Sequence, residues 1–332
     1  MSDDAYARAG VSQGAGDIAV AALVEALAAG RSGESRQVLA SGHYANVVRI
    51  DERTGVALTT DGVGTKLLVA ESLGRWDTVG IDCVAMNVND LICVGAEPLA
   101  MVDYLAVERA DPEVAAQVGK GLAAGAEQAG IEIVGGELAQ LGELIRGLDL
   151  AGAAFGVVAL DSLVAGAAIE PGDPVLGLPS SGLHSNGYTL ARSALAEVPM
   201  DDERLGRPLG EALLEPTLIY VRPVLELLRS EVEVRGLAHI TSGGLGNLLR
   251  LDADVGYEID DPLPVPPIFE LIQDLGQVSD DEMHDVFNMG CGFCAVVAPG
   301  DEAAALELLR SHHPEAKRIG TVTAEAGRLA RT

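Results

Sequence analysis

The alternation of short β-rich runs with helical stretches constrains the fold of this chain more than any other feature of its sequence. This rhythm is typical of α/β folds built in layers. In the first half it predicts strands Val56–Thr60, Pro98–Val107, Ile131–Val134 and Leu148–Leu160, and helices Thr78–Val94 and Asp111–Ala129, the second of which has Pro112 at its first position.

The second half repeats the rhythm after a turn-rich segment, Asp161–Pro174. At about 150 residues per domain, the 332 residues correspond to about two domains. We therefore expect an α/β protein with two domains, residues 1–160 and residues 161–332. The elements predicted in the second half are strands Val175–Leu178, Leu237–Thr241, Cys291–Val297 and Arg318–Thr323, and helices Tyr188–Ala196, Pro216–Leu228, Ser279–Phe287 and Glu302–Ser311.

The charge balance excludes some classes of partner. The chain has 22 Lys and Arg against 50 Asp and Glu, a formal net charge of −28. A nucleic-acid binder needs cationic surface to displace counterions from phosphates, so neither nucleic acid nor an anionic membrane is an expected partner. A small anionic substrate remains compatible, because salt screens distant charges over about 8–10 Å.

The cysteines and the chain ends indicate a cytoplasmic protein. Four cysteines in a chain of this length do not form a disulfide framework. Cys291 and Cys294 have the spacing C-x-x-C, which fits either two small core residues or a redox or metal pair. The first six residues lack the features of a signal peptide, and the longest apolar run, near Leu150–Leu160, is too short to cross a bilayer.

Two segments of the first half carry candidate chemistry. Asp61–Lys66 (DGVGTK) directly follows a predicted strand, where glycine amides suit an anion, Lys66 could reach a phosphate and Asp61 could hold a divalent cation. Helix Gly80–Val94 carries Asp82, Asn87, Asn89 and Asp90 in an otherwise apolar sequence. Such polar residues are costly unless they are paired or bind a ligand, so the helix presents either hydrogen-bonded core residues or a metal or ligand face.

A third segment, Val134–Glu137 (VGGE), places two glycines and a carboxylate after a predicted short strand. Asp61, Asp90 and Glu137 together offer the oxygen ligands that Mg²⁺ prefers. Asp103 is either a fourth candidate ligand or an inward residue satisfied by the backbone.

Two histidines of the second half lie in glycine-rich turns that follow predicted strands. His184 belongs to Ser180–Tyr188 and His239 to Ala238–Gly244. A histidine can act as an acid or base near neutral pH, although a lone histidine is more often structural. The sequence has no G-x-S-x-G elbow, which disfavours acyl-enzyme hydrolysis.

Taken in order, these segments resemble the aminoimidazole ribonucleotide (AIR) synthetase family, whose enzymes are also called phosphoribosylformylglycinamidine cyclo-ligases. The residues that carry the resemblance are Thr59–Lys66 (TTDGVGTK), Gly80–Ala106, Val134–Glu137, Ser180–Leu190 (SSGLHSNGYTL), Glu215–Val221 (EPTLIYV), Ala238–Gly244 (AHITSGG) and Phe287–Phe293 (FNMGCGF).

The resemblance implies a fold, a reaction and a set of ligands. It implies two α/β domains and a homodimer whose N-terminal strands form a shared barrel. It implies ATP and Mg²⁺ as cofactors and closure of the imidazole ring of formylglycinamidine ribonucleotide. In this reaction ATP phosphorylates the formamide oxygen to an iminophosphate, the amidine nitrogen attacks, and phosphate leaves.

Matched motif by motif, the resemblance also implies roles for individual residues. Asp61, Asp90 and Glu137 would hold Mg²⁺, and Lys66, His184 and His239 would be catalytic, with Lys66 facing phosphates. The residues implied to bind ATP or substrate are Asp61, Gly62, Gly64, Thr65, Lys66, Asn87, Gly135, Gly136, Ser185, Asn186, Gly243 and Gly244.

The sequence also departs from the family pattern, and two alternative functions stay open. A glycine-rich loop near the N-terminus is replaced by Ser41–Val48 (SGHYANVV), Leu138–Gly142 replaces the usual residues after VGGE, and Ser242 stands where glycine is usual. One alternative is a sibling enzyme such as thiamine-monophosphate kinase, selenophosphate synthetase or the hydrogenase maturation ATPase. The other is a non-catalytic nucleotide-binding relative.

Overall fold

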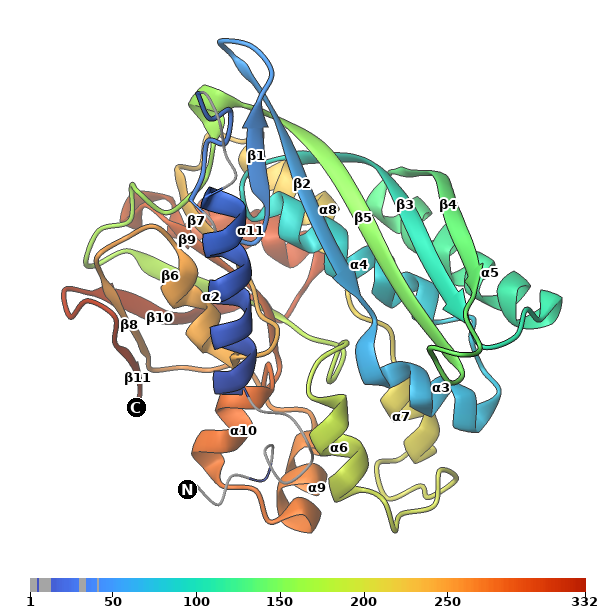
Figure 1. The fold of residues 1–332 in the computed structure, drawn as a ribbon. Coiled ribbons are helices and arrows are strands. Elements are labelled where there is room, and N and C mark those ends of the chain that lie inside the picture. The colour runs from blue at the N-terminus through green and yellow to red at the C-terminus, as the bar shows by residue number, and fades with distance from the viewer. Residues whose placement is uncertain (1–4, 6–12, 30–33, 41) are drawn as a thin grey trace.

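The two halves of the chain each form a β-sheet covered by helices (Figure 1). The structure is a computed structural model that describes residues 5, 13–29, 34–40 and 42–332. The first six residues, for which the sequence predicts no signal peptide, lie outside the described residues except for Ala5. Ser41 of the Ser41–Val48 segment also lies outside them. The predicted two-domain α/β fold with mixed sheets is confirmed.

The N-terminal sheet has five strands in the order β1-β2-β5-β3-β4, and only β3 and β4 run parallel to each other. Its strands are β1 (Asn46–Arg49), β2 (Thr54–Gly62), β3 (Glu97–Val107), β4 (Glu132–Gln140) and β5 (Leu148–Ala159). Helices α4 (Val79–Ile92) and α5 (Pro112–Ala129) cover one face and lie behind the strands in Figure 1. The two helices approach closely at Gly80, where an added Cβ would lie 2.2 Å from the Leu122 nitrogen.

The other face of this sheet is open and apolar. Leu58, Val102, Tyr104 and Phe155 point outward from the three central strands and remain 37–48% exposed. In a single chain the sheet is not closed, because β1 and β4 form its two edges. Exposed apolar side chains gathered on one face of a sheet indicate an interaction site.

The C-terminal sheet has six strands in the order β11-β8-β10-β6-β9-β7. Its strands are β6 (Pro174–Pro179), β7 (Val234–His239), β8 (Gly256–Ile259), β9 (Cys291–Val297), β10 (Lys317–Thr323) and β11 (Leu329–Arg331). The central strands β6 and β9 are buried along nearly their whole length, as expected for strands covered on both faces. Its helices are α6 (Tyr188–Ala194), α7 (Leu209–Leu214), α8 (Val221–Leu228), α9 (Pro267–Gly276), α10 (Asp280–Val286) and α11 (Glu302–His312).

Some observed elements differ from the predicted ones, and several others were not predicted, among them β1, β8, β11, α3 (Leu67–Leu73), α7 and α9. Helix α8 begins at Val221 instead of Pro216, because side chains of α4 bind the backbone of the preceding segment. Strand β4 extends to Gln140 through its parallel ladder with β3, so VGGE lies inside a strand rather than after one. The turn at Gly243 leads into a 3₁₀ helix, η3 (Gly244–Arg250), and α2 (Gln13–Ala29) was not predicted.

Helix α4 lies between the two halves of the protein. It packs against β2 and β5 of its own sheet and also against α8 and β7 of the other half. Three polar residues of α4, Asp82, Asn89 and Asp90, therefore have partners more than 100 residues away in sequence. No helix among the described residues is long and apolar enough to span a membrane.

Candidate active site

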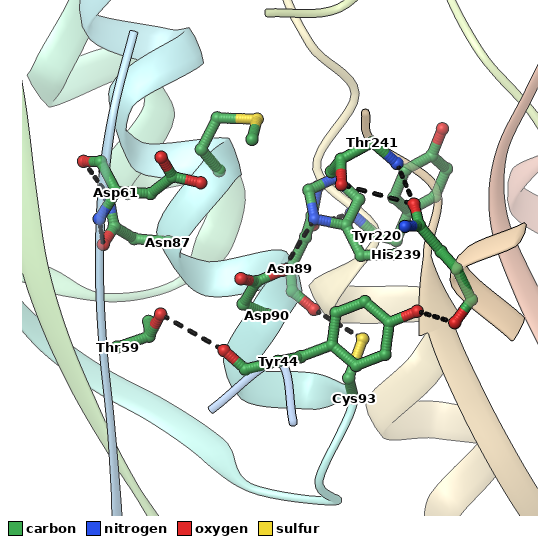
Figure 2. A network of polar contacts seen from close by, with 12 residues as sticks. Tyr44, Thr59, Asp61, Asn87, Asn89, Asp90, Cys93, Tyr220, His239 and Thr241 are labelled. Atoms are coloured by element: carbon green, nitrogen blue, oxygen red, sulfur yellow. Dashed lines mark hydrogen bonds and ion pairs between the residues drawn. The ribbon is translucent and has the colours of Figure 1, made fainter. Parts of the chain in front are cut away.

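Asn87 of α4 fixes the end of strand β2. The Asp61 amide donates to Asn87 Oδ1 over 3.0 Å, and Asn87 Nδ2 donates to the Asp61 carbonyl over 3.1 Å. Figure 2 shows this two-way contact beside the Asp61 side chain. Asn87 is completely buried, and its amide pairs with a backbone unit in the same way that a neighbouring strand would. Its position makes Asn87 a residue that orients Asp61.

The Asp61 carboxyl group lies in an unfavourable electrostatic environment. Burial, followed by the negative charge of Asp90, raises the pKa of Asp61 to about 6, although the Gly62 amide, His239 and Arg250 oppose the shift. A carboxylate whose proton affinity is raised by a neighbouring carboxylate forms with it a donor set that fits a hard divalent cation. Asp61 and Asp90 therefore fit the predicted Mg²⁺ role by their chemistry.

Asp90 and His239 form a contact between the two halves of the protein (Figure 2). His239 Nδ1 lies 2.9 Å from Asp90 Oδ1, and the histidine ring is completely buried. Because a carboxylate accepts hydrogen bonds and does not donate them, Nδ1 carries the proton of this contact. Asn89 Nδ2 lies 3.5 Å from the other ring nitrogen, Nε2. The ring is thus held from both sides by α4.

Asn89 itself binds the backbone of the segment that precedes α8. Its Nδ2 donates to the Leu218 carbonyl over 2.8 Å, and its Oδ1 accepts from the Tyr220 amide over 3.0 Å. These bonds hold residues 217–220 outside the helix that the sequence predicts there. The sequence analysis left two alternatives for the polar residues of this helix, hydrogen-bonded core residues or a metal or ligand face. For Asn87 and Asn89 the structure shows the first.

Lys66 differs from the prediction that it faces phosphates. Its side chain is completely buried, and Nζ lies 2.8 Å from Asp82 Oδ2. Nζ also donates to the carbonyls of His184 and Glu215, over 3.1 and 2.6 Å. An ammonium group has three donors, so no donor is left for a phosphate. Burial lowers the pKa of Lys66, while Asp82 opposes the shift.

His184 is buried in a strained backbone conformation. Its φ is +61°, a left-handed value that is rare for a residue other than glycine. Its Nε2 accepts from the Ser181 amide over 3.2 Å, which leaves the proton of the neutral ring on Nδ1. Among the described residues Nδ1 has no hydrogen-bond partner. Burial, then the charges of His239 and Lys66, holds the pKa of His184 well below its usual value.

Glu137 does not lie near Asp61 and Asp90 within one chain. Strand register aligns Asp61, Gly152, Asp103 and Gly136 in one row across the sheet, on the face that α4 and α5 cover. Glu137 is the next residue, so it points from the outer face, opposite Tyr104. Among the described residues no group of three or more His, Cys, Asp or Glu side chains is arranged to hold a metal.

A groove of about 790 Å³ lies between α5 and strands β3 and β4. Its walls are apolar, with Leu105, Val118, Leu122 and Ile133 among them, and its rim includes Asp103, Gly136 and Glu137. Burial raises the pKa of Asp103. An apolar groove with a few polar groups at its rim is the usual form of a small-molecule site.

Several of the remaining predicted residues lie where the two halves meet. Thr65 Oγ1 lies 3.1 Å from Thr189 Oγ1, and Ser242 Oγ donates to Asn186 Oδ1 over 3.2 Å. Ser185 Oγ lies 3.3 Å from Thr217 Oγ1. The amides of Gly243 and Gly244 donate to the carbonyls of Asp285 and Thr241 over 2.9 and 3.1 Å, so they are not free for an anion. The positions of the other predicted glycines are Gly62 at the end of β2, Gly64 at the start of the following 3₁₀ turn, and Gly135 and Gly136 inside β4.

The sequence analysis missed the role of Tyr44. Its ring is buried beside Asp90 and Cys93 (Figure 2), and its hydroxyl donates to the Asn247 carbonyl over 2.7 Å. Asn247 Oδ1 in turn accepts from the Thr241 amide over 2.7 Å. Tyr44 therefore joins the N-terminal segment to the turn that follows His239. The departure of Ser41–Val48 from the family pattern was the signal that could have identified it.

The predicted alternative of two small core residues fits Cys291 and Cys294. Both are buried free cysteines, and their sulfur atoms lie 3.5 Å apart. Burial is the largest effect on the Cys294 thiol, and it raises the pKa of that group well above the usual value. A thiol in such surroundings is a poor nucleophile and a poor metal ligand.

Comparisons with known proteins cover nearly the whole chain. The chain is 54% identical over 293 residues to the phosphoribosylformylglycinamidine cyclo-ligase of Methanothermobacter thermautotrophicus, which covers 86% of this chain and 85% of the relative. It is 49% identical over 329 residues to the enzyme of the same name from Pyrococcus furiosus, and the match covers 97% of this chain and 96% of that relative. A solved HypE-HypF complex matches with a TM-score of 0.67 at 21% identity, covering 93% and 95%, and this likeness concerns the fold alone.

Two family descriptions match the chain on either side of the turn-rich segment. Residues 42–158 match the N-terminal domain of AIR synthase related proteins, and residues 170–330 match their C-terminal domain. The resemblance seen in the motifs is thereby confirmed. The chain belongs to the AIR synthase related protein family.

Proposed function

We propose that this chain catalyses the ATP-dependent ring closure of formylglycinamidine ribonucleotide to aminoimidazole ribonucleotide, with release of ADP and phosphate. The observation that carries the proposal is the 54% identity, over 86% of the chain, to an enzyme named for this reaction. ATP converts the formamide oxygen from a poor into a good leaving group. The amidine nitrogen then forms the new carbon–nitrogen bond, and the oxygen departs as phosphate.

In this proposal Asp61 and Asp90 hold Mg²⁺, which supplies charge neutralisation for the transferring phosphoryl group when it is bound. The raised pKa of Asp61, about 6, supports this role, because a cation would relieve the repulsion between the two carboxylates. Asn87 orients Asp61, and Lys66 positions the His184 turn instead of contacting ATP.

The two histidines take different parts in the proposal. His184 stays neutral and offers its unpaired Nδ1–H as a hydrogen-bond donor to substrate or to the transferring phosphate. His239, oriented by Asp90, is the candidate proton carrier for the amidine nitrogen. Ser185, Asn186 and the Gly243 turn shape the surrounding walls.

We further propose a homodimer that packs through the outer face of the N-terminal sheet and completes the site. Leu58, Tyr104 and Phe155 supply the apolar contact. Along the edge of β2, β1 covers Gly55–Leu58 and Asn87 covers the backbone of Asp61, so a second copy would meet this sheet through its outer face. Edge strand β4 of that copy would bring its own Glu137 to Asp61, a meeting that one chain does not allow.

The groove beside α5 is then the proposed place for the adenosine part of ATP. Its apolar walls suit a base, and Gly136 and Asp103 at its rim lie toward the row that leads to Asp61. In the proposed dimer each molecule of ATP lies between two copies. In this arrangement residues 1–160 bind ATP and form the dimer, and residues 161–332 complete the active site.

The test is phosphate release from ATP by the purified protein in Mg²⁺, with and without formylglycinamidine ribonucleotide. We expect release to require the substrate, with one phosphate for each ring formed. Asp61→Asn is expected to abolish ring closure and to leave the fold intact. Turnover near the wild-type rate in that variant would refute the role of Asp61, and substrate-independent release would refute the reaction.

A further inference from the structure

Positive charge is scarce around Asp61 and Asp90, and Lys66 cannot supply it. All three donors of Lys66 are occupied in the protein interior. A second cation lies close by: Arg250 is the last residue of η3, which follows the turn after His239. Its charge is among those that lower the pKa of Asp61.

The Arg250 side chain is held in one orientation. Its guanidinium carbon lies 4.1 Å from the centroid of the Tyr44 ring, and its Nε donates to the Gly42 carbonyl over 3.2 Å. The Tyr44 ring is itself fixed, because it is buried and its hydroxyl binds the Asn247 carbonyl, three residues before Arg250. Stacking on an aromatic ring and a hydrogen bond to Nε together pre-organise a guanidinium group.

This arrangement leaves the outer edge of the guanidinium group free. In the part of the chain that the structure describes, neither terminal amino group of Arg250 has a hydrogen-bond or ion-pair partner. Several other arginines are paired with carboxylates, for example Arg204 with Asp202 at 2.8 Å and Arg235 with Asp173 at 2.9 Å. The two terminal amino groups of a guanidinium match two oxygens of one phosphate group.

We propose that Arg250 is the phosphate-binding cation of this active site, and that Tyr44 is a positioning residue that aims it. The ligand is a phosphate group, carried either by ATP as its terminal phosphate or by the ribonucleotide substrate as its 5′-phosphate monoester. This inference rests on the proposed function and names the side chain that recognises its anionic ligands. It also assigns a role to the segment in which the chain departs from the family pattern.

The test measures binding by calorimetry for two probes: a non-hydrolysable ATP analogue with Mg²⁺, and aminoimidazole ribonucleotide. Arg250→Met is expected to weaken binding of at least one probe by about 10- to 100-fold, the range for a lost charge-assisted hydrogen-bonded pair. Arg250→Lys is expected to recover only part of the loss, because lysine lacks the two-pronged edge. Tyr44→Phe, which keeps the ring, is expected to bind more tightly than Tyr44→Leu.

The matched control is Arg53→Met, which also removes the positive charge of an arginine, but this residue immediately precedes β2, at the end of the strand opposite Asp61. It should leave both affinities within about twofold, a difference of about 0.4 kcal/mol. Weakening of the ATP analogue alone assigns Arg250 to the terminal phosphate, and weakening of the ribonucleotide alone assigns it to the 5′-phosphate. Unchanged affinity for both probes in a folded Arg250→Met protein overturns the proposal.

The two proposals fail separately. If the wild-type protein binds the ATP analogue but closes no ring, the proposed reaction falls, while the calorimetry of Arg250→Met still decides the phosphate subsite. If the wild-type protein binds neither probe, the phosphate subsite falls as well.

Discussion

Asp82 and Asp90 lie two helical turns apart on the same side of α4, and the protein uses them differently. Asp82 is completely buried and has several partners: Lys66 Nζ at 2.9 Å, and the amide and hydroxyl of Thr217 at 2.8 and 2.7 Å. Asp90 has its hydrogen bond to His239, and its side chain is 14% exposed. The first carboxylate is paired with a buried ammonium group, although its Oδ2 makes no hydrogen bond among the described residues, and the second is paired with a histidine and lies beside another carboxylate, Asp61.

The contrast separates a structural charge from one available for chemistry. Both aspartates join the two halves of the protein, so contact across the domain boundary does not distinguish them. What distinguishes them is the charge beside them and their access to solvent. Asp82 is fully buried against the Lys66 ammonium group and resists change, whereas Asp90 is partly exposed beside a second carboxylate, and such a pair attracts a cation.

The largest effect on stability is expected at Asp82. Asp82→Asn removes one charge of the buried pair and leaves the Lys66 ammonium without its counter-ion, which should lower the free energy of unfolding by about 3–5 kcal/mol. Denaturant unfolding measures the change. The control is Asp77→Asn, whose partner Lys120 lies 3.4 Å away at the surface, and there we expect about 1 kcal/mol or less. Equal losses in the two variants would contradict the comparison.

A smaller effect of opposite sign is expected for Asp61→Asn in metal-free protein. The pKa of Asp61 is about 6 against an ordinary 3.8, so the folded state binds a proton more tightly than the unfolded state. The ionised carboxylate therefore costs stability above pH 6, and the cost disappears as the pH falls below 4. The variant should be more stable than wild type by about 2 kcal/mol at pH 8, and the difference should vanish near pH 4.

Thermal or denaturant unfolding at both pH values, in the presence of a chelator, tests this dependence. A variant less stable than wild type at pH 8 would show that Asp61 is stabilised in the fold, contrary to the electrostatics described above. Such a result would also remove a reason for assigning a cation to this site.

The smallest effect on stability is expected at Asp90. Asp90→Asn keeps an acceptor for His239 Nδ1, so the free energy of unfolding should stay within about 1 kcal/mol of wild type. The rate of ring closure should nevertheless fall by about 100-fold, because the proposed Mg²⁺ site loses a charged oxygen and His239 loses a charged partner. Steady-state kinetics beside unfolding measurements separates the two quantities. A large loss of stability with little loss of rate would show that Asp90, like Asp82, has a structural role.

The sequence was sufficient for most of the elements and for the identity of the polar residues, but not for their partners. The strand and helix rhythm predicted the central strands of both sheets, because periodicity and turn residues are local signals, but it missed the short strands β1, β8 and β11. The burial and hydrogen bonds of Lys66 were not predictable. Its acceptors are Asp82 and the carbonyls of His184 and Glu215, which are distant in sequence. The face from which Glu137 points depends on the register between β3 and β4, which one sequence does not specify.

The position of α4 has a consequence for how this protein could be recombined with its relatives. The helix belongs to the first half of the chain, yet Asp82, Asn89 and Asp90 bind Thr217, Tyr220 and His239 of the second half. A chimera that joins the first half of this protein to the second half of a relative inherits one side of each contact. Such hybrids should be active only when the relative's second half supplies matching partners at the positions of residues 217, 220 and 239.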